Sequence, residues 1–320
     1  MFKNPWINKQ LGQVSERLSV WLRRPIVWAP PRRVALETAN FCNLRCPMCK
    51  LGRRELGRDP GTMDYDKYCR LIDELYPSVR RLSFPWYGEP FAHGDFGRFV
   101  TYAADKGMAI HILTNGTFLH DRDIDYLVDS RVRSIGVAID GLTQATYEQY
   151  RVGGRLDDVT AGIRRLAALR RERGSRYPER IEMKFLVMSH NEHEVPDVEA
   201  FGRELGCDRV TLKTMHVDGT EEGNRLLPQD PKYRRYDADL NLRSGRDRAP
   251  GCPDLWRAAV VSWDGAMGAC CMDGDCEYSP GNVFDEGFFG VWFGETMQAF
   301  RRRVLREKDR IPLCRNCVRG

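Results

Sequence analysis

Short aliphatic stretches alternate with amphipathic stretches along the chain between residues 34 and 215. The aliphatic stretches are rich in β-branched residues, a composition typical of buried strands. The pattern predicts six strands, at residues 34–39, 80–86, 108–114, 134–139, 180–188 and 208–215.

Between these strands, apolar residues recur at helical spacing. The spacing predicts helices at residues 65–76, 121–130, 156–173 and 196–205. Asp64 and Asp121 stand where an N-cap side chain would accept a hydrogen bond from the first turn. Six alternations of strand and helix predict an α/β fold in which crossover helices join parallel strands.

An amphipathic segment, residues 1–33, precedes the first strand. Its basic residues face a single acid, Glu16, and its apolar residues fall on one helical face: Leu11, Val14, Leu18, Trp21 and Leu22. We expect this helix to pack against the outside of the main domain. The alternative is a weak peripheral contact with an anionic membrane, because tryptophans and cations suit that interface.

Composition narrows the class of protein. The chain has 320 residues, of which 42% are hydrophobic and 30% charged, and it lacks the long apolar run of a transmembrane helix. Eleven cysteines without a secretory signal favour metal ligation in a reducing cytoplasm over a disulfide framework. The net charge of +5 is spread among acids, so we expect no nucleic-acid partner.

Three cysteines follow the first predicted strand: Cys42, Cys46 and Cys49. A loop this tight can wrap three thiolates around one corner of a 4Fe–4S cluster. Such a cluster normally takes four thiolates, so three leave one iron open to an outside ligand. The alternative is a zinc knot, but zinc sites usually add a second cysteine pair, and none follows before Cys252.

This C-x3-C-x2-C triplet resembles the signature of radical S-adenosylmethionine (SAM) enzymes. The resemblance implies a partial (β/α)6 TIM-like barrel, with SAM bound to the open iron through its amino and carboxylate groups. It further implies that the cluster, reduced by a donor such as flavodoxin or ferredoxin, cleaves SAM to a 5′-deoxyadenosyl radical. That radical takes a hydrogen atom from the substrate.

Polar motifs follow several predicted strands, at the edge where such barrels carry their chemistry. Singly they are ordinary turns. The resemblance places Gly88 and Glu89 at the SAM amino group, and Asp140 at the ribose. It also assigns Thr114, Asn115 and Gly116 to the SAM ribose or the substrate.

The last two strands end in further candidate residues. Lys213 and His216 are candidates for contacting the substrate or acting as acid or base. Two histidines lie near residue 190, but their spacing does not fit a zinc protease, and we expect Asn191 to cap the next helix instead. Cys207 is expected to be a packing residue, with hydrogen-atom donation as the alternative.

The C-terminal cysteines, which flank a Trp263–Gly265 hairpin turn, resemble a SPASM domain in its short "twitch" form. The resemblance implies one auxiliary 4Fe–4S cluster held by Cys252, Cys270, Cys314 and Cys317. Either Cys271 or Cys276 is an alternative ligand, and a zinc ribbon is the alternative site. The implied organisation is an extension (1–33), a radical SAM core (34–219), a connecting segment (220–251) and an auxiliary domain (252–320).

The two clusters indicate an enzyme rather than an iron–sulfur electron carrier, which would need no open iron. A fully ligated auxiliary cluster accepts an electron and so suits oxidation, whereas epimerisation needs a hydrogen donor. No separate peptide-recognition domain is evident, which favours a radical SAM oxidoreductase (dehydrogenase) or epimerase acting on a small hydroxylated substrate such as a sugar or aminocyclitol. The alternative is a peptide-modifying enzyme or a protein maturase.

Overall fold

The computed structural model describes residues 4–84, 86–217, 220–236, 251–315 and 317. Six strands run parallel, in the sheet order β6-β5-β4-β3-β2-β1. Their bounds are β1 Arg33–Leu36, β2 Arg81–Phe84, β3 Ala109–Thr114, β4 Val132–Ala138, β5 Arg180–Val187 and β6 Arg209–Thr214. The sheet does not close on itself, which confirms the predicted α/β fold with a partial barrel.

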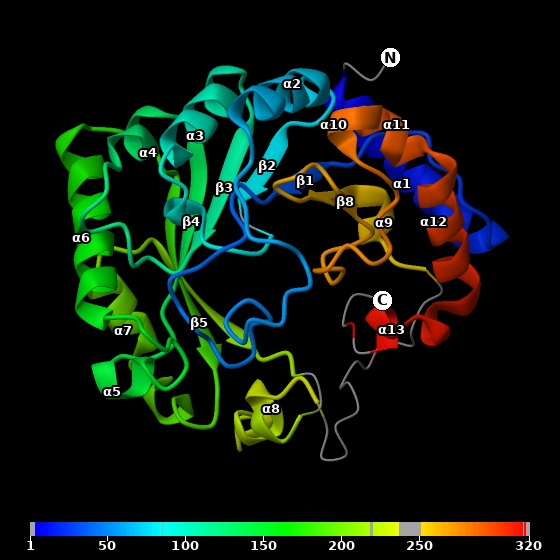
Figure 1. Cartoon of the computed structure of the whole chain (residues 1–320). Helices are drawn as coiled ribbons and strands as arrows, with labels where there is room; N and C mark the ends of the chain where they lie inside the picture. Colours follow the sequence, from blue (N-terminus) through cyan, green and yellow to red (C-terminus); the bar gives the residue numbers. More distant parts are fainter. Residues whose placement is uncertain (1–3, 85, 218–219, 237–250, 316, 318–320) are drawn as a thin grey trace.

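Helices line one side of this sheet, and the loop after β1 crosses the other side (Figure 1). The connecting helices are α2 Tyr65–Leu75, α3 Phe96–Asp105, α4 Asp125–Asp129, short α5 Gln144–Tyr147, α6 Leu156–Glu172 and α7 Val198–Glu204. The Asp64 side chain accepts the Lys67 amide as predicted. Helix α4 begins at Asp125, so the prediction of a helix from Asp121 was wrong, and α3 was not predicted at all.

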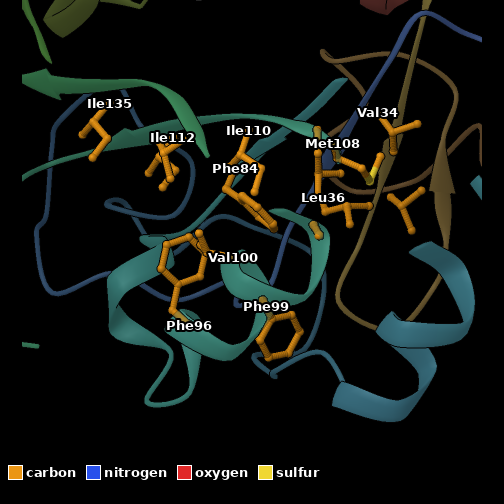
Figure 2. Packing of buried hydrophobic residues seen from close by; sticks show 14 of the residues in the cluster. Val34, Leu36, Phe84, Phe96, Phe99, Val100, Met108, Ile110, Ile112 and Ile135 are labelled. Carbon is orange, nitrogen blue, oxygen red and sulfur yellow. The ribbon is translucent and has the colours of Figure 1, made fainter. Parts of the chain in front are cut away.

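The apolar core lies between the sheet and these helices. Phe84, Ile110 and Ile112 of the sheet pack against Phe96 and Phe99 of α3 (Figure 2). Successive strand residues point to opposite faces, so the residues between these apolar positions face away from the helices: Ser83, His111, Ser134, Glu182 and Lys184. The sheet therefore presents a polar inner face.

The C-terminal part of the chain joins the same sheet. β7 (Ala258–Val261) pairs parallel with β1, and β8 (Met267–Gly268) returns antiparallel through a turn in which Gly265 has φ +92°. The predicted hairpin is thus confirmed, and it extends the sheet to eight strands. The surrounding helices are α9 Asp254–Arg257, α10 Val283–Glu286, α11 Phe288–Phe293, α12 Glu295–Glu307 and α13 Pro312–Arg315.

Two peripheral segments complete the described chain. Helix α8 (Glu221–Arg225) lies in the predicted connecting segment, whose residues 237–250 are outside the described part. Helix α1 (Pro5–Leu22) is capped by Asn4, whose side chain accepts hydrogen bonds from the amides of Trp6 and Ile7. No described helix has the length and apolar character needed to cross a membrane.

Candidate functional site

The cysteine loop that follows β1 opens onto a cavity of about 260 Å³ at the inner face of the sheet. Cys42, Cys46 and Cys49 all line it, with Tyr150 and Arg151 from the segment after α5. Residues at the ends of β2, β3 and β4 complete the lining, among them Tyr87, Gly88, Glu89, Thr114, Asn115 and Ala138. The structure therefore brings the predicted triplet together with four of the predicted SAM-binding residues.

Backbone contacts shape the cysteine loop. The Cys49 amide donates to the Cys46 carbonyl at 3.1 Å, and the Arg45 amide donates to the Val152 carbonyl at 3.0 Å. A Cβ on Gly52 would lie 2.4 Å from the Cys46 carbonyl oxygen, so only glycine permits this close return of the chain. Burial raises the pKa of the Cys42 thiol to about 11. The thiolate form therefore needs a metal or cluster to stabilise it.

The Glu89 carboxylate accepts hydrogen bonds from several residues in the wall of the cavity. Its side chain accepts Thr114 Oγ1 at 2.6 Å, the Asn115 amide at 2.7 Å and the Phe91 amide at 3.2 Å. The residue is 2% exposed, and burial raises the pKa of its carboxyl to about 7 despite these hydrogen bonds. The three donors are neutral and the charge of Arg151 has a smaller effect, so a bound cation would stabilise the charged carboxylate further. The ammonium group of SAM fits this requirement.

Asn115 connects Glu89 to the cysteine loop. Its Nδ2 donates to Asn43 Oδ1 at 3.0 Å and lies 3.4 Å from Cys42 Sγ. The backbone on either side is held by glycines with positive φ, +82° at Gly88 and +81° at Gly116. A Cβ on Gly88 would lie 2.0 Å from the Ala39 carbonyl oxygen, so the predicted glycine is required by close packing.

Arg151 is the residue of this cavity that the sequence analysis missed. Its guanidinium pairs with Asp140, with Nε 2.6 Å from Oδ2, while Nη1 lies 3.6 Å from Cys46 Sγ. Asp140 is 1% exposed, and its second oxygen accepts the Leu186 amide at 2.7 Å. The carboxylate predicted to bind ribose is therefore engaged in orienting Arg151. A Tyr-Arg pair before two glycines, 150–154, was the available sequence signal.

Four cysteines of the C-terminal part form a second group. Burial raises the pKa of Cys252 to about 11, and the nearby Cys317 adds to the shift. Burial also raises the pKa of Cys270, with further contributions from Cys271, Cys252 and Cys314. The thiols therefore lie near enough to act on one another electrostatically.

Neither group is arranged as a single-metal site. Among the described residues, no three Cys, His, Asp or Glu side chains converge closely enough to hold one metal ion. A cubane spreads its thiolates over different iron atoms, so its ligands need not converge on one point.

The two remaining C-terminal cysteines, Cys271 and Cys276, differ in their exposure and in their surroundings. Cys271 is exposed, and its carbonyl accepts the Trp86 indole N–H at 3.0 Å. Cys276 has φ +56°, and burial raises the pKa of its thiol to about 12 beside Arg58. The charged groups that act most strongly on Cys276 are Arg58, Asp273, Asp264 and Glu37.

Arg58 fastens the cysteine loop to the C-terminal part. Its guanidinium makes a bidentate pair with Glu37 at 2.7 and 2.8 Å, and its Nε donates to the Gly274 carbonyl at 2.6 Å. Lys50 and Asp275 add an ion pair at 2.5 Å between the same two segments. The relative placement of the two cysteine groups thus depends on charged contacts that the sequence analysis did not identify.

Replacing Arg58 by methionine is expected to lower the free energy of unfolding by about 3–5 kcal/mol, because Glu37 would become a buried, unpaired carboxylate. The Glu37 side chain is 0% exposed in the structure. Urea unfolding monitored by tryptophan fluorescence measures the change. Arg53→Met is the control. Arg53 pairs with Glu55, whose side chain is exposed to solvent, and this pair should contribute about 1 kcal/mol at most to the free energy of unfolding. Equal losses in both variants would contradict this role for Arg58.

The remaining predicted residues lie outside this cavity lining. Lys213 is on β6 at the inner face, where burial and the nearby Lys184 lower its pKa. His216 Nδ1 lies 2.9 Å from the Tyr236 hydroxyl. Asn191 precedes a short 3-10 helix, Glu192–Glu194, but its side chain makes no capping hydrogen bond, so the prediction of a cap was wrong. Its amide instead donates to the Asp140 and Leu186 carbonyls and thereby joins the ends of β4 and β5.

Cys207 has the surroundings of a packing residue. It lies before β6 and packs at the margin of the hydrophobic core. Burial raises the pKa of its thiol to about 12. Cys207 does not appear among the residues that line the cysteine cavity.

Family comparisons match both cysteine groups. Residues 36–178 match the family model described as the radical SAM superfamily, and residues 252–318 match SPASM, described as an iron–sulfur cluster-binding domain. The first range contains the cysteine triplet and the second contains the four C-terminal cysteines.

Individual relatives extend the match over most of the chain. A tungsten-containing aldehyde ferredoxin oxidoreductase cofactor-modifying protein of Pyrococcus furiosus is 25% identical over 88% of this chain and 86% of its own length. The antilisterial bacteriocin subtilosin biosynthesis protein AlbA of Bacillus subtilis is 21% identical over 88% of this chain. The match covers 64% of AlbA, so this chain spans less than two thirds of that relative.

Solved structures share the fold. Streptococcus suis SuiB bound to S-adenosylmethionine superposes with a TM-score of 0.68. The alignment has 13% sequence identity and covers 91% of this chain and 73% of SuiB. At that identity the likeness concerns the fold alone.

Proposed function

Because the chain belongs to the radical SAM superfamily and carries a SPASM iron–sulfur domain, we propose that Cys42, Cys46 and Cys49 hold its SAM-binding cluster. The observation that carries this proposal is the cavity where these three thiols face Glu89 and Arg151. When bound, the reduced cluster and SAM supply a 5′-deoxyadenosyl radical that can remove a hydrogen atom from a C–H bond. The electron comes from a low-potential donor such as flavodoxin or ferredoxin.

The protein side chains bind and orient SAM in this proposal. The Glu89 carboxylate receives the cationic amino group, and Thr114 and Asn115 hold that carboxylate in place. Arg151, oriented by Asp140, offers a cation to the SAM carboxylate and stabilises the Cys46 thiolate. Gly88 and Gly116 allow the strand ends that carry these side chains to pack closely, against Ala39 and against Val137 and Val159 respectively.

The second group of thiols is proposed to hold the auxiliary cluster. Cys252, Cys270, Cys314 and Cys317 supply four ligands, which leaves no iron open for substrate. A cluster of this kind suits the transfer of an electron from a substrate radical. Trp86 lines both the cavity of the triplet and a second cavity beside Cys270, and its indole donates to the Cys271 carbonyl.

The substrate is proposed to bind at the polar inner face of β3 to β6. His111 Nδ1 lies 2.8 Å from Ser134 Oγ, and the Lys184 ammonium lies 3.5 Å from Glu182. Hydrogen-bonding groups of this kind suit a small hydroxylated substrate, with oxidation or epimerisation as the outcome.

Peptide modification is the second candidate function, and the comparisons favour it. AlbA is a bacteriocin biosynthesis protein. A structure of SuiB bound to a precursor peptide superposes on this chain with a TM-score of 0.65. The relative from Pyrococcus furiosus is named for the modification of a cofactor, and that name is compatible with a substrate that is not a peptide.

The binding role of Glu89 is tested by Glu89→Gln, which keeps the side-chain volume and removes the charge. SAM affinity of the reconstituted protein, measured by equilibrium dialysis, is expected to fall about tenfold or more, because a charge-assisted hydrogen bond contributes about 1.5–3 kcal/mol. Glu204→Gln, at an exposed carboxylate on α7, is the control. Unchanged affinity in Glu89→Gln would contradict the proposed site.

A further inference from the structure

Helix α1 packs against the rest of the molecule through its polar side. The residues it buries lie on one helical face: Asn8, Gly12, Ser15, Glu16 and Ser19. Apolar side chains predicted to share one face instead remain exposed, including Leu11 at 36%, Val14 at 47% and Trp21 at 78%. This arrangement reverses the usual amphipathic helix, whose apolar side faces the core.

Specific polar contacts hold α1 in this orientation. Glu16 makes a bidentate ion pair with Arg257 at 2.6 and 2.7 Å. The Ser19 hydroxyl accepts the Ile26 amide at 2.8 Å, and Asn8 Nδ2 donates to the Ser78 carbonyl at 3.4 Å. Rotating the helix to bury its apolar side would break these contacts and leave Glu16 unpaired.

The exposed apolar residues concentrate in this region. Eleven large hydrophobic residues are exposed in the described part of the chain, and seven of them lie between residues 6 and 28. They are Trp6, Ile7, Leu11, Val14, Trp21, Leu22 and Trp28. We call these seven residues the α1 surface. Apolar surface gathered in this way is a mark of an interaction site.

The charge beside the α1 surface is positive. Lys9, Arg17, Arg23 and Arg24 are exposed. Between residues 4 and 33 the sequence has one acid, Glu16, and Arg257 already pairs with it. A second copy of this chain seated on the α1 surface would place like charges together, whereas an anionic surface complements them.

Tryptophan-rich, basic helices are suited to the boundary between lipid headgroups and acyl chains. We propose that the α1 surface binds anionic lipid membranes peripherally, with the tryptophans at the headgroup level and the cations facing the phosphates. The polar side of α1 stays fixed to α9 through Arg257 of that helix. The proposal is independent of the reaction, and it assigns to α1 the peripheral contact that the sequence left as an alternative.

Co-sedimentation of the reconstituted 320-residue chain with vesicles tests this proposal. Binding is expected to vesicles of three parts phosphatidylcholine to one part phosphatidylglycerol, and weaker binding to pure phosphatidylcholine or in 0.5 M salt. Leu11→Glu/Trp21→Glu is expected to weaken binding about tenfold or more. Arg17→Gln/Arg24→Gln removes two cations, each expected to contribute about fivefold to the affinity for anionic vesicles, so binding should weaken about 25-fold.

Leu212→Gln is the matched control, because Leu212 is 41% exposed on β6, far from α1 in the chain. It should bind vesicles as the wild type does. Circular dichroism melting checks that every variant is folded, and light scattering gives the oligomeric state. Failure of the wild type to sediment with anionic vesicles would overturn the proposal. A dimer that Leu11→Glu/Trp21→Glu dissociates, without vesicle binding, would assign the surface to a second copy.

Discussion

Replacing Cys42, Cys46 and Cys49 together by alanine is expected to abolish SAM cleavage while leaving the auxiliary cluster in place. The three thiols line one cavity and are proposed to ligate one cluster, so the variant loses every protein ligand of that cluster. The second group of cysteines lies in another part of the chain, and about four irons per chain should remain after reconstitution. Iron content and 5′-deoxyadenosine are measured on the same samples.

The matched control for this variant is Cys207→Ala. Its thiol packs at the margin of the core and does not line the cavity, so it should retain both clusters and full cleavage. Loss of all iron from the triple variant would mean that the two cysteine groups do not act as separate sites. Retained cleavage would show that SAM is activated elsewhere.

Arg151→Met is expected to lower the free energy of unfolding by about 3–5 kcal/mol, because it leaves the buried Asp140 carboxylate without a counter-ion. The side chains of Arg151 and Asp140 are 16% and 1% exposed, and their closest atoms are 2.5 Å apart. Asp140 acts to raise the pKa of Arg151, so the guanidinium stays charged in the cavity despite the opposing effect of burial. Chemical unfolding of the cluster-free protein measures the loss without interference from iron.

A double-mutant cycle separates the ion pair from side-chain packing. Asp140→Asn in the Arg151→Met background removes the stranded charge, so the double variant should be more stable than Arg151→Met alone. Arg155→Met is the control, since Arg155 is 75% exposed and lies 3.8 Å from its partner Asp158. If Arg151→Met is no less stable than that control, the pair has no structural role.

The strands could be predicted because each is short, aliphatic and bounded by polar turns. All six predicted strands of the barrel match the structure to within about two residues at most ends, and long, periodic helices such as α6 match equally well. Helix α3 was missed although Phe96, Phe99, Val100 and Ala103 have helical spacing. Gly94 and Gly97 interrupt the pattern at its start, and glycine disfavours a helix there.

Long-range pairing could not be predicted from local pattern. β7 joins β1 after more than two hundred intervening residues, and only backbone register in the folded chain places it there. The orientation of α1 is a second case. Its apolar spacing predicted a buried apolar side, but the ion pair of Glu16 with the distant Arg257 fixes the opposite orientation.

Some residues of the candidate site could be predicted from the sequence, and others could not. The cysteines and Glu89 carry recognisable spacing, and the structure places the triplet, Glu89 and Asn115 around one cavity. Arg58 carries no motif, and the Tyr-Arg pair before two glycines does not show what Arg151 does, because both roles depend on acids that fold beside the arginines, Glu37 and Asp140. Arginines are frequent in this sequence, so composition alone could not single these two out.

The most direct test of the account is anaerobic reconstitution of the wild-type chain with iron and sulfide, followed by reduction and addition of SAM. We expect about eight irons per chain, no stoichiometric zinc, and release of 5′-deoxyadenosine. Zinc in place of iron at Cys252, Cys270, Cys314 and Cys317 would contradict the two-cluster account. Two full clusters without any deoxyadenosine, tested also with candidate substrates present, would contradict the assignment of the Cys42 cavity as a radical SAM site.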